Sequence, residues 1–284
     1  MALTVGGAFY DFYSAINLSS EYRDLANTRR DWVVRRLQAG GLSIVESYSM
    51  GSIPRYTALK DHADLDVMVV LDYYRHIDGS KPSSVLSTVR TALGTGAGHI
   101  RRNGQAVTIT FDSWPNVDVV PAARYNDTNG HVARYEIPDM NREVWLKSNP
   151  PQHSRDILAA ATNRGPNFRR VITMLKDWNR RQDVKLQSYH LEVIALKLSM
   201  DWSDEPWAIF QWFDDARGMV DSCWHADQDV SRYLSYDRRV RVKAQLAATT
   251  NVARSAWHAG YQGDCQQAVT LWKSIFGMRF PSYG

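Results

Sequence analysis

Hydrophobic positions in the first half of the chain recur mostly with the period of β-strands. Residues 105–111 alternate apolar and polar side chains and predict a half-buried strand, whereas residues 64–71 end in a continuous apolar run typical of a strand buried on both faces. Residues 43–50 form a third apolar segment that ends before a glycine. A fourth strand is expected from Val117, and Pro121 should end it because proline cannot donate to a strand ladder.

Helical periodicity is typical of residues 19–38 and dominates the second half of the chain from about Asn167. We expect Ser20 to cap the first of these helices and a pair of glycines to end it. Residues 87–94 predict a shorter helix within the strand-rich half. The proline-containing, polar segment 147–156 is predicted to be a loop that forms the seam between two lobes.

These elements predict an α/β (α+β) fold in which a mixed-sheet lobe is followed by a helical lobe. We expect the first lobe, with its long N-terminal helix, to span residues 1–155 and the helical lobe to span residues 156–284. Ligand sites often lie between domains, so the active site is expected in the cleft between the lobes.

Composition and charge narrow the class of protein. The 284 residues are 44% hydrophobic with a formal net charge of +4, which is a globular composition compatible with an anionic ligand. Acids lie among the clustered arginines, so we expect solvated helix surfaces and no nucleic-acid activator. Only two cysteines are present, which favours a cytoplasmic location. The N-terminus is a poor signal peptide and the apolar run Val67–Leu71 is too short to span a membrane, so no membrane partner is expected.

Three carboxylates are the main candidates for chemistry. Asp64 and Asp66 are two positions apart at the start of a predicted strand, so their side chains should share one face. Asp118 has the same placement on another strand. Carboxylate oxygens from two adjacent strands suit Mg²⁺, which keeps positions free for phosphate oxygens and water. The alternative is that these acids are solvated residues at the rim of a sheet.

A Gly-Ser pair precedes the acids. Gly51 would let the backbone approach a ligand closely, and Ser52 is expected to open a short helix whose N-terminus could bind phosphate. The simpler interpretation is a strand-to-helix turn capped by Ser52. The third acid, Asp118, favours the phosphate-binding interpretation.

The order of these motifs resembles that of the DNA polymerase β-like nucleotidyltransferases. The segment "LKDWNRRQDVKLQSYHLEVIALKL" narrows the resemblance to the branch of cyclic GMP-AMP synthase and oligoadenylate synthase, particularly the bacterial CD-NTases of anti-phage CBASS systems. The C-terminal "WKSIFGMRFP" is similar to the end of those bacterial enzymes. The resemblance covers nearly the whole chain and implies a polymerase β-like catalytic lobe followed by a helical lobe of the oligoadenylate synthase kind.

The resemblance also implies roles for the residues of the first lobe. Asp64, Asp66 and Asp118 would be catalytic and would hold two Mg²⁺ ions, with Mn²⁺ as a substitute. Gly51 and Ser52 would bind the triphosphate of the donor nucleotide.

Three residues of the second lobe would complete the nucleotide site by the same resemblance. Lys176 would contact the donor phosphates, Ser188 would add a phosphate contact, and the ring of Tyr189 would stack on the base. The alternatives are a solvated helix face for Lys176 and a core position for Tyr189. His190 and Glu192, in the same motif, are expected to be structural.

The activity implied is the joining of ribonucleoside triphosphates, with ATP and GTP expected, into a cyclic dinucleotide or small cyclic oligonucleotide with release of pyrophosphate. The product would activate a separate effector in anti-phage signalling. The alternatives are a linear oligoadenylate synthase, another polymerase β-like transferase acting on tRNA or on the hydroxyl of a small molecule, and an inactive nucleotide-binding module. Some CBASS synthases are conjugated through a C-terminal glycine, so Gly284 is an expected target of a conjugation machinery.

Overall fold

The computed structural model describes residues 4–60, 62–94 and 99–284, and these divide into two compact units. Unit 1 contains residues up to 17, residues 57–61 and residues from 156 onward. Unit 2 contains residues 18–56 and 62–155. The N-terminal residues and the segment around Thr57 therefore belong with the helical part, whereas the sequence-based division placed both in the first lobe.

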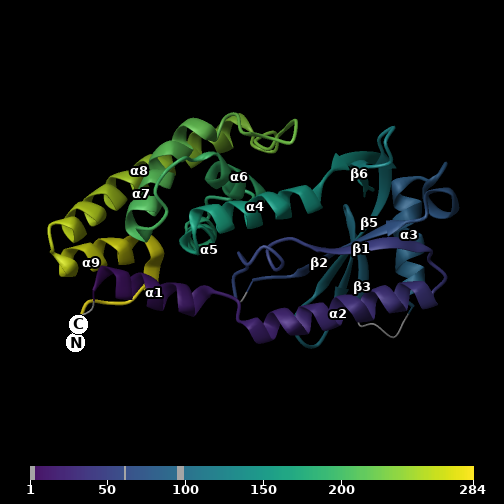
Figure 1. Cartoon of the computed structure of the whole chain (residues 1–284), viewed down its shortest axis with the longest axis horizontal. Helices are drawn as coiled ribbons and strands as arrows, with labels where there is room; N and C mark the ends of the chain where they lie inside the picture. The colour runs from purple at the N-terminus through teal and green to yellow at the C-terminus, as the bar shows by residue number, and fades with distance from the viewer. Residues whose placement is uncertain (1–3, 61, 95–98) are drawn as a thin grey trace. The chain divides into compact units, whose positions relative to one another are not determined.

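The described part of unit 2 is built on a seven-stranded mixed sheet (Figure 1). Its strands are β1 (Ile44–Met50), β2 (Leu65–Leu71), β3 (His99–Asn103), β4 (Ala106–Thr110), β5 (Val117–Asn126), β6 (Val132–Asp139) and β7 (Val144–Ser148). The strand order is β1-β2-β5-β4-β3, with β6 paired to β5 and β7 paired to β6. Strands β2 and β5 are parallel and the other pairs are antiparallel. The strands expected from the hydrophobic pattern are all present.

Strand β5 continues through Pro121, so the prediction that proline ends it is wrong. The ladder between β5 and β4 extends to Val119, and the ladder between β5 and β6 begins at Ala123. Pro121 is opposite Val69 in the parallel pairing with β2 and lies in the interval where β5 changes its antiparallel partner. Its missing N–H therefore removes no bond of the antiparallel ladders with β4 and β6.

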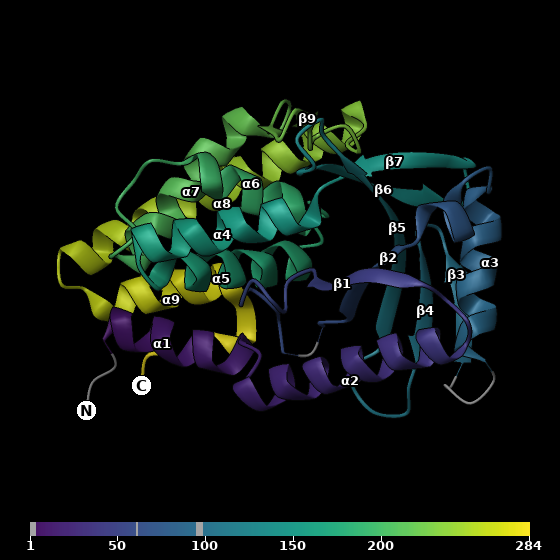
Figure 2. The same cartoon turned by 45° about the vertical axis from the view of Figure 1, so that its right-hand side comes forward.

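Two helices pack against this sheet, α2 (Ser20–Ala39) beside β1 and β2, and α3 (Pro82–Leu93) beside β3, β4 and β5 (Figure 2). The N-cap of α2 is Ser19 and not Ser20. The guanidinium of Arg29 donates to the carbonyl oxygen of Ser113 at 2.7 Å and lies over the ring of Phe111. Arg29, one of the clustered arginines, therefore has a structural role in unit 2. A short π-helix, η1 (Tyr73–Ile77), follows β2.

Unit 1 is helical and has one large hydrophobic core. Its elements are α1 (Val5–Ile16), the end of α4 (Pro150–Arg164), α5 (Asn167–Arg181), α6 (Ser188–Lys197), α7 (Glu205–Met219), the hairpin β8 (Trp224–His225) and β9 (Gln228–Asp229), α8 (Tyr236–Tyr261), α9 (Cys265–Phe276) and η2 (Gly277–Arg279). The ring of Phe9 lies 5.2 Å from that of Trp272 and 5.1 Å from that of Phe280. These contacts place α1 next to α9, as the purple and yellow helices show in Figure 1, and explain why the N-terminal helix belongs to this unit.

Residues 150–156 are the first turns of α4, so the predicted loop over 147–156 is wrong. Asn149 precedes the helix, and its side-chain oxygen accepts from the backbone N–H of Gln152 at 3.3 Å. Prolines are tolerated in the first turn because its N–H groups need no partner within the helix.

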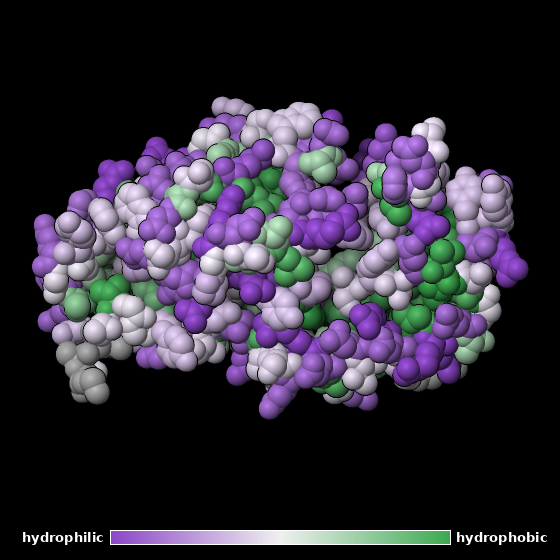
Figure 3. All heavy atoms as spheres, viewed as in Figure 1, coloured by the Kyte–Doolittle hydropathy of each residue, from purple (hydrophilic) through white to green (hydrophobic). Residues whose placement is uncertain are grey.

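The visible face in Figure 3 is mostly hydrophilic or neutral, and hydrophobic residues form smaller groups on it. Across the described ranges, no helix combines the length and the apolar character needed to cross a bilayer. Cys223 and Cys265 are both free thiols.

Candidate active site

Two of the three predicted acids face each other across neighbouring strands. Asp66 of β2 and Asp118 of β5 are register partners in the parallel pair, so both side chains project from the same face of the sheet. Thr108, on the other side of β5, is the antiparallel partner of Asp118, and its hydroxyl donates to Oδ1 of that carboxylate at 2.5 Å. One oxygen of the Asp118 carboxylate is thus held by Thr108. Asp64 is exposed and comes directly before β2.

The negative charge at this point of the sheet is unfavourable. Burial and the neighbouring charge of Asp118 raise the pKa of Asp66 to about 6, against the opposing effect of Arg55. Burial and Asp118 also raise the pKa of Asp64. Carboxylates that raise each other's pKa favour a bound cation, because the cation compensates the repulsion.

Gly51 lies directly against this cluster. Its φ of +71° favours glycine, and a Cβ atom at this position would come within 1.9 Å of Oδ2 of Asp66. Only glycine therefore lets the backbone lie alongside the carboxylate of Asp66. The sequence predicted a close approach of the backbone at Gly51 to a ligand, and the structure shows a close approach to the acid itself.

The segment that follows Gly51 is not a helix, so the expected helical phosphate site at Ser52 is wrong in that detail. Residues 51–56 form successive turns, with the N–H of Tyr56 donating to the carbonyl oxygen of Ile53 at 3.1 Å. Pro54 disfavours helical dihedral angles at Ile53. Ser52 is half-buried and stays next to Gly51, but a helix dipole does not contribute there.

The donor chemistry of the acids suits Mg²⁺, although the side chains do not form a closed ligand set. Of the residues that the structure describes, no three His, Cys, Asp or Glu side chains are grouped closely enough to hold a metal ion. The acids nevertheless interact electrostatically and supply only hard oxygen donors. Asp64, Asp66 and Asp118 are the residues that would hold such an ion.

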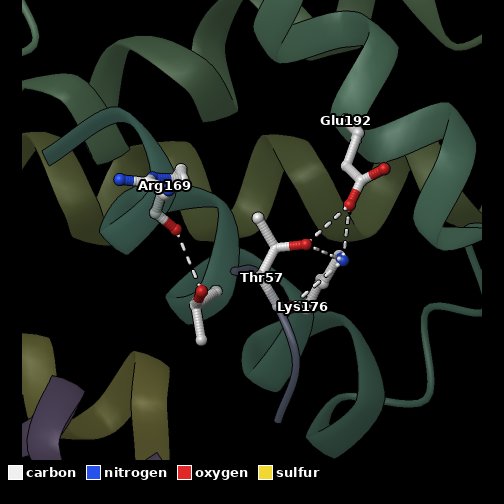
Figure 4. A network of polar contacts seen from close by, with 5 residues as sticks. Thr57, Arg169, Lys176 and Glu192 are labelled. Atoms are coloured by element: carbon white, nitrogen blue, oxygen red, sulfur yellow. Dashed lines mark hydrogen bonds and ion pairs between the residues drawn. The ribbon is translucent and has the colours of Figure 1, made fainter. Parts of the chain in front are cut away.

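Lys176 is buried in a polar network inside unit 1 (Figure 4). Its ammonium group lies 2.6 Å from Oε1 of Glu192, 2.8 Å from the hydroxyl of Thr57 and 3.2 Å from the carbonyl oxygen of Thr57. The Thr57 hydroxyl in turn donates to Glu192 at 2.9 Å. Three bonds are the donor capacity of an ammonium group, so these contacts give Lys176 a structural role within unit 1. The contact with the donor phosphates expected of Lys176 stays a prediction.

The other two predicted residues of unit 1 begin helix α6. Ser188 is exposed in its first turn, and Tyr189 is half-buried against the core of the unit. The side chain of Asn179 fixes the preceding loop, because its Nδ2 donates to the carbonyl oxygen of Leu186 at 2.8 Å and its Oδ1 accepts from the N–H of Leu186 at 2.9 Å. The exposed hydroxyl of Ser188 and the half-buried ring of Tyr189 are compatible with contacts to a ligand.

Residues 3–160 match the profile of the Second Messenger Oligonucleotide or Dinucleotide Synthetase (SMODS) domain. This match covers more than half of the chain. The chain belongs to the SMODS family. The resemblance to the bacterial CD-NTases, inferred from the acids and from the α5–α6 motif, is confirmed.

Two curated relatives are similar over most of their length. A probable cyclic nucleotide synthase of Bacillus cereus (strain VD146) is 22% identical over 331 residues, covering 100% of this chain and 99% of the relative. A cyclic AMP-AMP-AMP synthase of Acinetobacter sp. (strain ATCC 27244 / 9458) is 24% identical over 263 residues, covering 84% of this chain and 73% of the relative.

A solved structure supports the fold. E. coli MS115-1 CdnC, determined with ATP, superposes with a TM-score of 0.80 at 18% identity, over 97% of this chain and 98% of that one. The predicted polymerase β-like fold of the CD-NTases is confirmed.

Two residues of this SMODS protein interact with the acids although the sequence did not indicate them as site residues. The alternation of residues 105–111 places Thr108 on the polar side of a half-buried strand, whereas the structure buries it with a bond to Asp118. Arg55 is buried and its charge acts on Asp66. The polar alternation of residues 105–111 was the available signal for Thr108, whereas no local pattern pointed to Arg55.

Proposed function

We propose that this member of the SMODS family joins ribonucleoside triphosphates into a cyclic dinucleotide or small cyclic oligonucleotide and releases pyrophosphate. The observation that carries the proposal is the pairing of Asp66 with Asp118 on parallel strands, with Gly51 against the Asp66 carboxylate. The names of the curated relatives, both nucleotide synthases, support the same activity.

The chemical step needs no nucleophilic side chain. A ribose hydroxyl of one nucleotide attacks the α-phosphorus of another, the bond to the β-phosphate oxygen breaks, and pyrophosphate leaves with that electron pair. The Asp118 oxygen that Thr108 does not occupy orients the attacking hydroxyl and accepts its proton. Formation of a second such bond within the linear product closes the ring.

Asp64, Asp66 and Asp118 are the proposed ligands of two Mg²⁺ ions, for which Mn²⁺ can substitute. Mg²⁺ held by these three carboxylates would supply a lower pKa for the attacking hydroxyl and compensation of the triphosphate charge. The raised pKa values of Asp64 and Asp66 support this assignment, since burial and the neighbouring carboxylates outweigh the opposing charge of Arg55.

Four residues are proposed to hold the nucleotide. Gly51 and Ser52 bind the donor triphosphate through the backbone and hydroxyl of their turn, Ser188 adds a phosphate contact, and Tyr189 stacks on the base. Lys176 is the proposed further contact to the donor phosphates. Its bonds to Thr57 and Glu192 also join α5 to α6, the helix that carries Ser188 and Tyr189.

The decisive experiment separates the reaction products. The protein is incubated with labelled ATP, GTP, CTP and UTP and Mg²⁺ or Mn²⁺, and the products are treated with phosphatase. A phosphatase-resistant product supports cyclisation, whereas a product that is entirely phosphatase-sensitive identifies a linear synthase. Binding of nucleotide without release of pyrophosphate would identify an inactive module. If Asp64→Asn with Asp66→Asn leaves turnover intact, the metal assignment is wrong.

ATP and GTP are the proposed substrates, and the product is proposed to act on a separate effector in the cytoplasm. The effector assignment is tested by adding purified product to a candidate effector and measuring activation against a linear dinucleotide of the same bases.

A further inference from the structure

Two hydrogen bonds in unit 1 connect the ring of Tyr189 to helix α4. The Tyr189 hydroxyl lies 2.8 Å from Nδ1 of His225, and Nε2 of His225 lies 2.9 Å from Oδ2 of Asp156. A carboxylate only accepts, so Nε2 carries a proton and Nδ1 accepts from the Tyr189 hydroxyl in the neutral imidazole. In the protonated imidazole, Nδ1 donates to the same oxygen. The contact is therefore compatible with both protonation states.

His225 contacts Tyr189 at the hydroxyl end and does not stack on its ring. The two ring planes are inclined at 82° with their centroids 5.8 Å apart, which is an edge-type contact and not a stack. Tyr189 also packs on the core of unit 1 but is only half-buried. The ring is thus held at its polar end while part of it stays accessible.

The hairpin that carries His225 has a tight two-residue turn. Its turn residues, Ala226 and Asp227, have φ values of +46° and +61°, as a type I′ hairpin turn requires. At the base of the hairpin, Oδ1 of Asp229 accepts from the N–H of Ser231 at 2.9 Å and from its hydroxyl at 2.7 Å. The turn and these bonds fix the place of His225 at the end of β8.

The backbone of Tyr189 is fixed independently of its hydroxyl. The hydroxyl of Tyr233 accepts from the N–H of Gln187 at 2.8 Å and contacts Nδ1 of His190 at 3.2 Å, so one side chain organises the first turn of α6. Tyr189 is therefore restrained both at its backbone and at the far end of its ring.

We propose that His225 and Asp156 are positioning residues that hold the ring of Tyr189 as the surface on which the base of the donor nucleotide stacks. This inference rests on the proposed function and extends it to two residues that no motif indicated. A ring that is already restrained loses little rotational freedom when a base stacks on it, so restraint increases affinity without a new contact to the ligand. Neither residue needs to touch the nucleotide.

A double-mutant cycle tests the proposal. Tyr189→Phe, His225→Phe and the double variant are compared by the Kd of nonhydrolysable ATP and GTP analogues and by KM and kcat. Each single variant should raise Kd and KM about 3- to 10-fold, with kcat nearly unchanged. The double variant should be no weaker than either single one, because both changes remove the same contact. Tyr189→Ala should weaken binding about 10- to 100-fold because the ring itself is lost.

Variants of Asp156 test the second hydrogen bond, between Asp156 and His225. Asp156→Ala should resemble His225→Phe, whereas Asp156→Asn keeps an acceptor for Nε2 and should recover most of the affinity. His131→Phe is the matched control, since its side chain is 81% exposed in unit 2 and it should leave Kd unchanged.

Additive effects in the cycle would overturn the proposal, because His225 would then act independently of the Tyr189 hydroxyl. If His225→Phe fails to fold, Tyr189→Phe still decides, and an unchanged Kd in that variant rejects the inference. A wild-type protein that neither binds the analogues nor releases pyrophosphate from ATP and GTP would instead reject the proposed function.

Discussion

The acids on β2 and β5 and the network between α5 and α6 use charged residues in opposite ways. In unit 2, Asp64, Asp66 and Asp118 raise the pKa of carboxyl groups in their own cluster. In unit 1, Lys176 and Glu192 are both buried but lie 2.6 Å apart and share the hydroxyl of Thr57. The acid cluster keeps an excess of negative charge, whereas the charges of Lys176 and Glu192 compensate each other.

Whether the charges of a cluster are compensated distinguishes residues that bind a ligand from residues that stabilise the fold. The motifs alone do not make this distinction, because the acids and the α5–α6 segment both contributed to the resemblance to the CD-NTases. The unbalanced carboxylates favour a ligand, because a cation would relieve their repulsion. The balanced lysine stabilises the junction of two helices, and a phosphate would have to break its bonds.

The largest expected effect is loss of turnover in Asp66→Asn, by about 10³-fold, because one carboxylate of the proposed metal site loses its charge. The measurement is pyrophosphate release at saturating nucleotide. Asp127→Asn is the matched control in the same unit, since Asp127 is exposed and its Oδ1 accepts the backbone N–H groups of Asn129 and His131 in a turn. Turnover that survives in Asp66→Asn would remove this residue from the site.

Lys176→Met should lower the free energy of unfolding by about 3–5 kcal/mol, because the carboxylate of Glu192 stays buried without its cation. Lys176→Met combined with Glu192→Met should recover most of that loss. Urea denaturation at pH 7 measures both. A large rise in the KM for nucleotide with unchanged stability would contradict the structural role and support the predicted phosphate contact.

Gly51→Ala should destabilise the protein by about 2–4 kcal/mol, from the positive φ and from displacement of the Asp66 carboxylate. Gly130→Ala is the matched control, because Gly130 has a φ of +81° but a Cβ atom there meets nothing within 4 Å. Gly130→Ala should lower the free energy of unfolding by only about 1–2 kcal/mol. Equal losses in thermal denaturation would mean that the contact with Asp66 contributes nothing.

The smallest effect concerns stability and pH. The pKa of Asp66 is raised to about 6, so the folded protein binds this proton more tightly than the unfolded chain does. The stabilisation of the folded protein by protonated Asp66 is therefore lost as the pH rises from about 4 to about 6. Without divalent metal, Asp66→Asn should be about 1–2 kcal/mol more stable than the wild type at pH 7 and similar to it at pH 4. An equal difference at both pH values would show that charge is not the cause.

The sequence by itself determined the elements and the shared face of the acids. The periods of residues 43–50, 64–71 and 105–111 predict strands, because side-chain alternation is a local property of the backbone. The apolar run after Asp66 predicts burial, and Gly51 predicts a close backbone approach. These features need no knowledge of distant residues.

Only the tertiary structure decided which groups those residues meet. Pro121 stays within β5 because the partner strand changes there, and Thr108 meets Asp118 because two strands pair. Thr57 and Glu192 are 135 positions apart, yet their bond explains why Lys176 is directed inward. Hydrogen-bond partners and burial depend on contacts between distant segments, so a motif can name a residue correctly and still leave its partner, and therefore its role, to the fold.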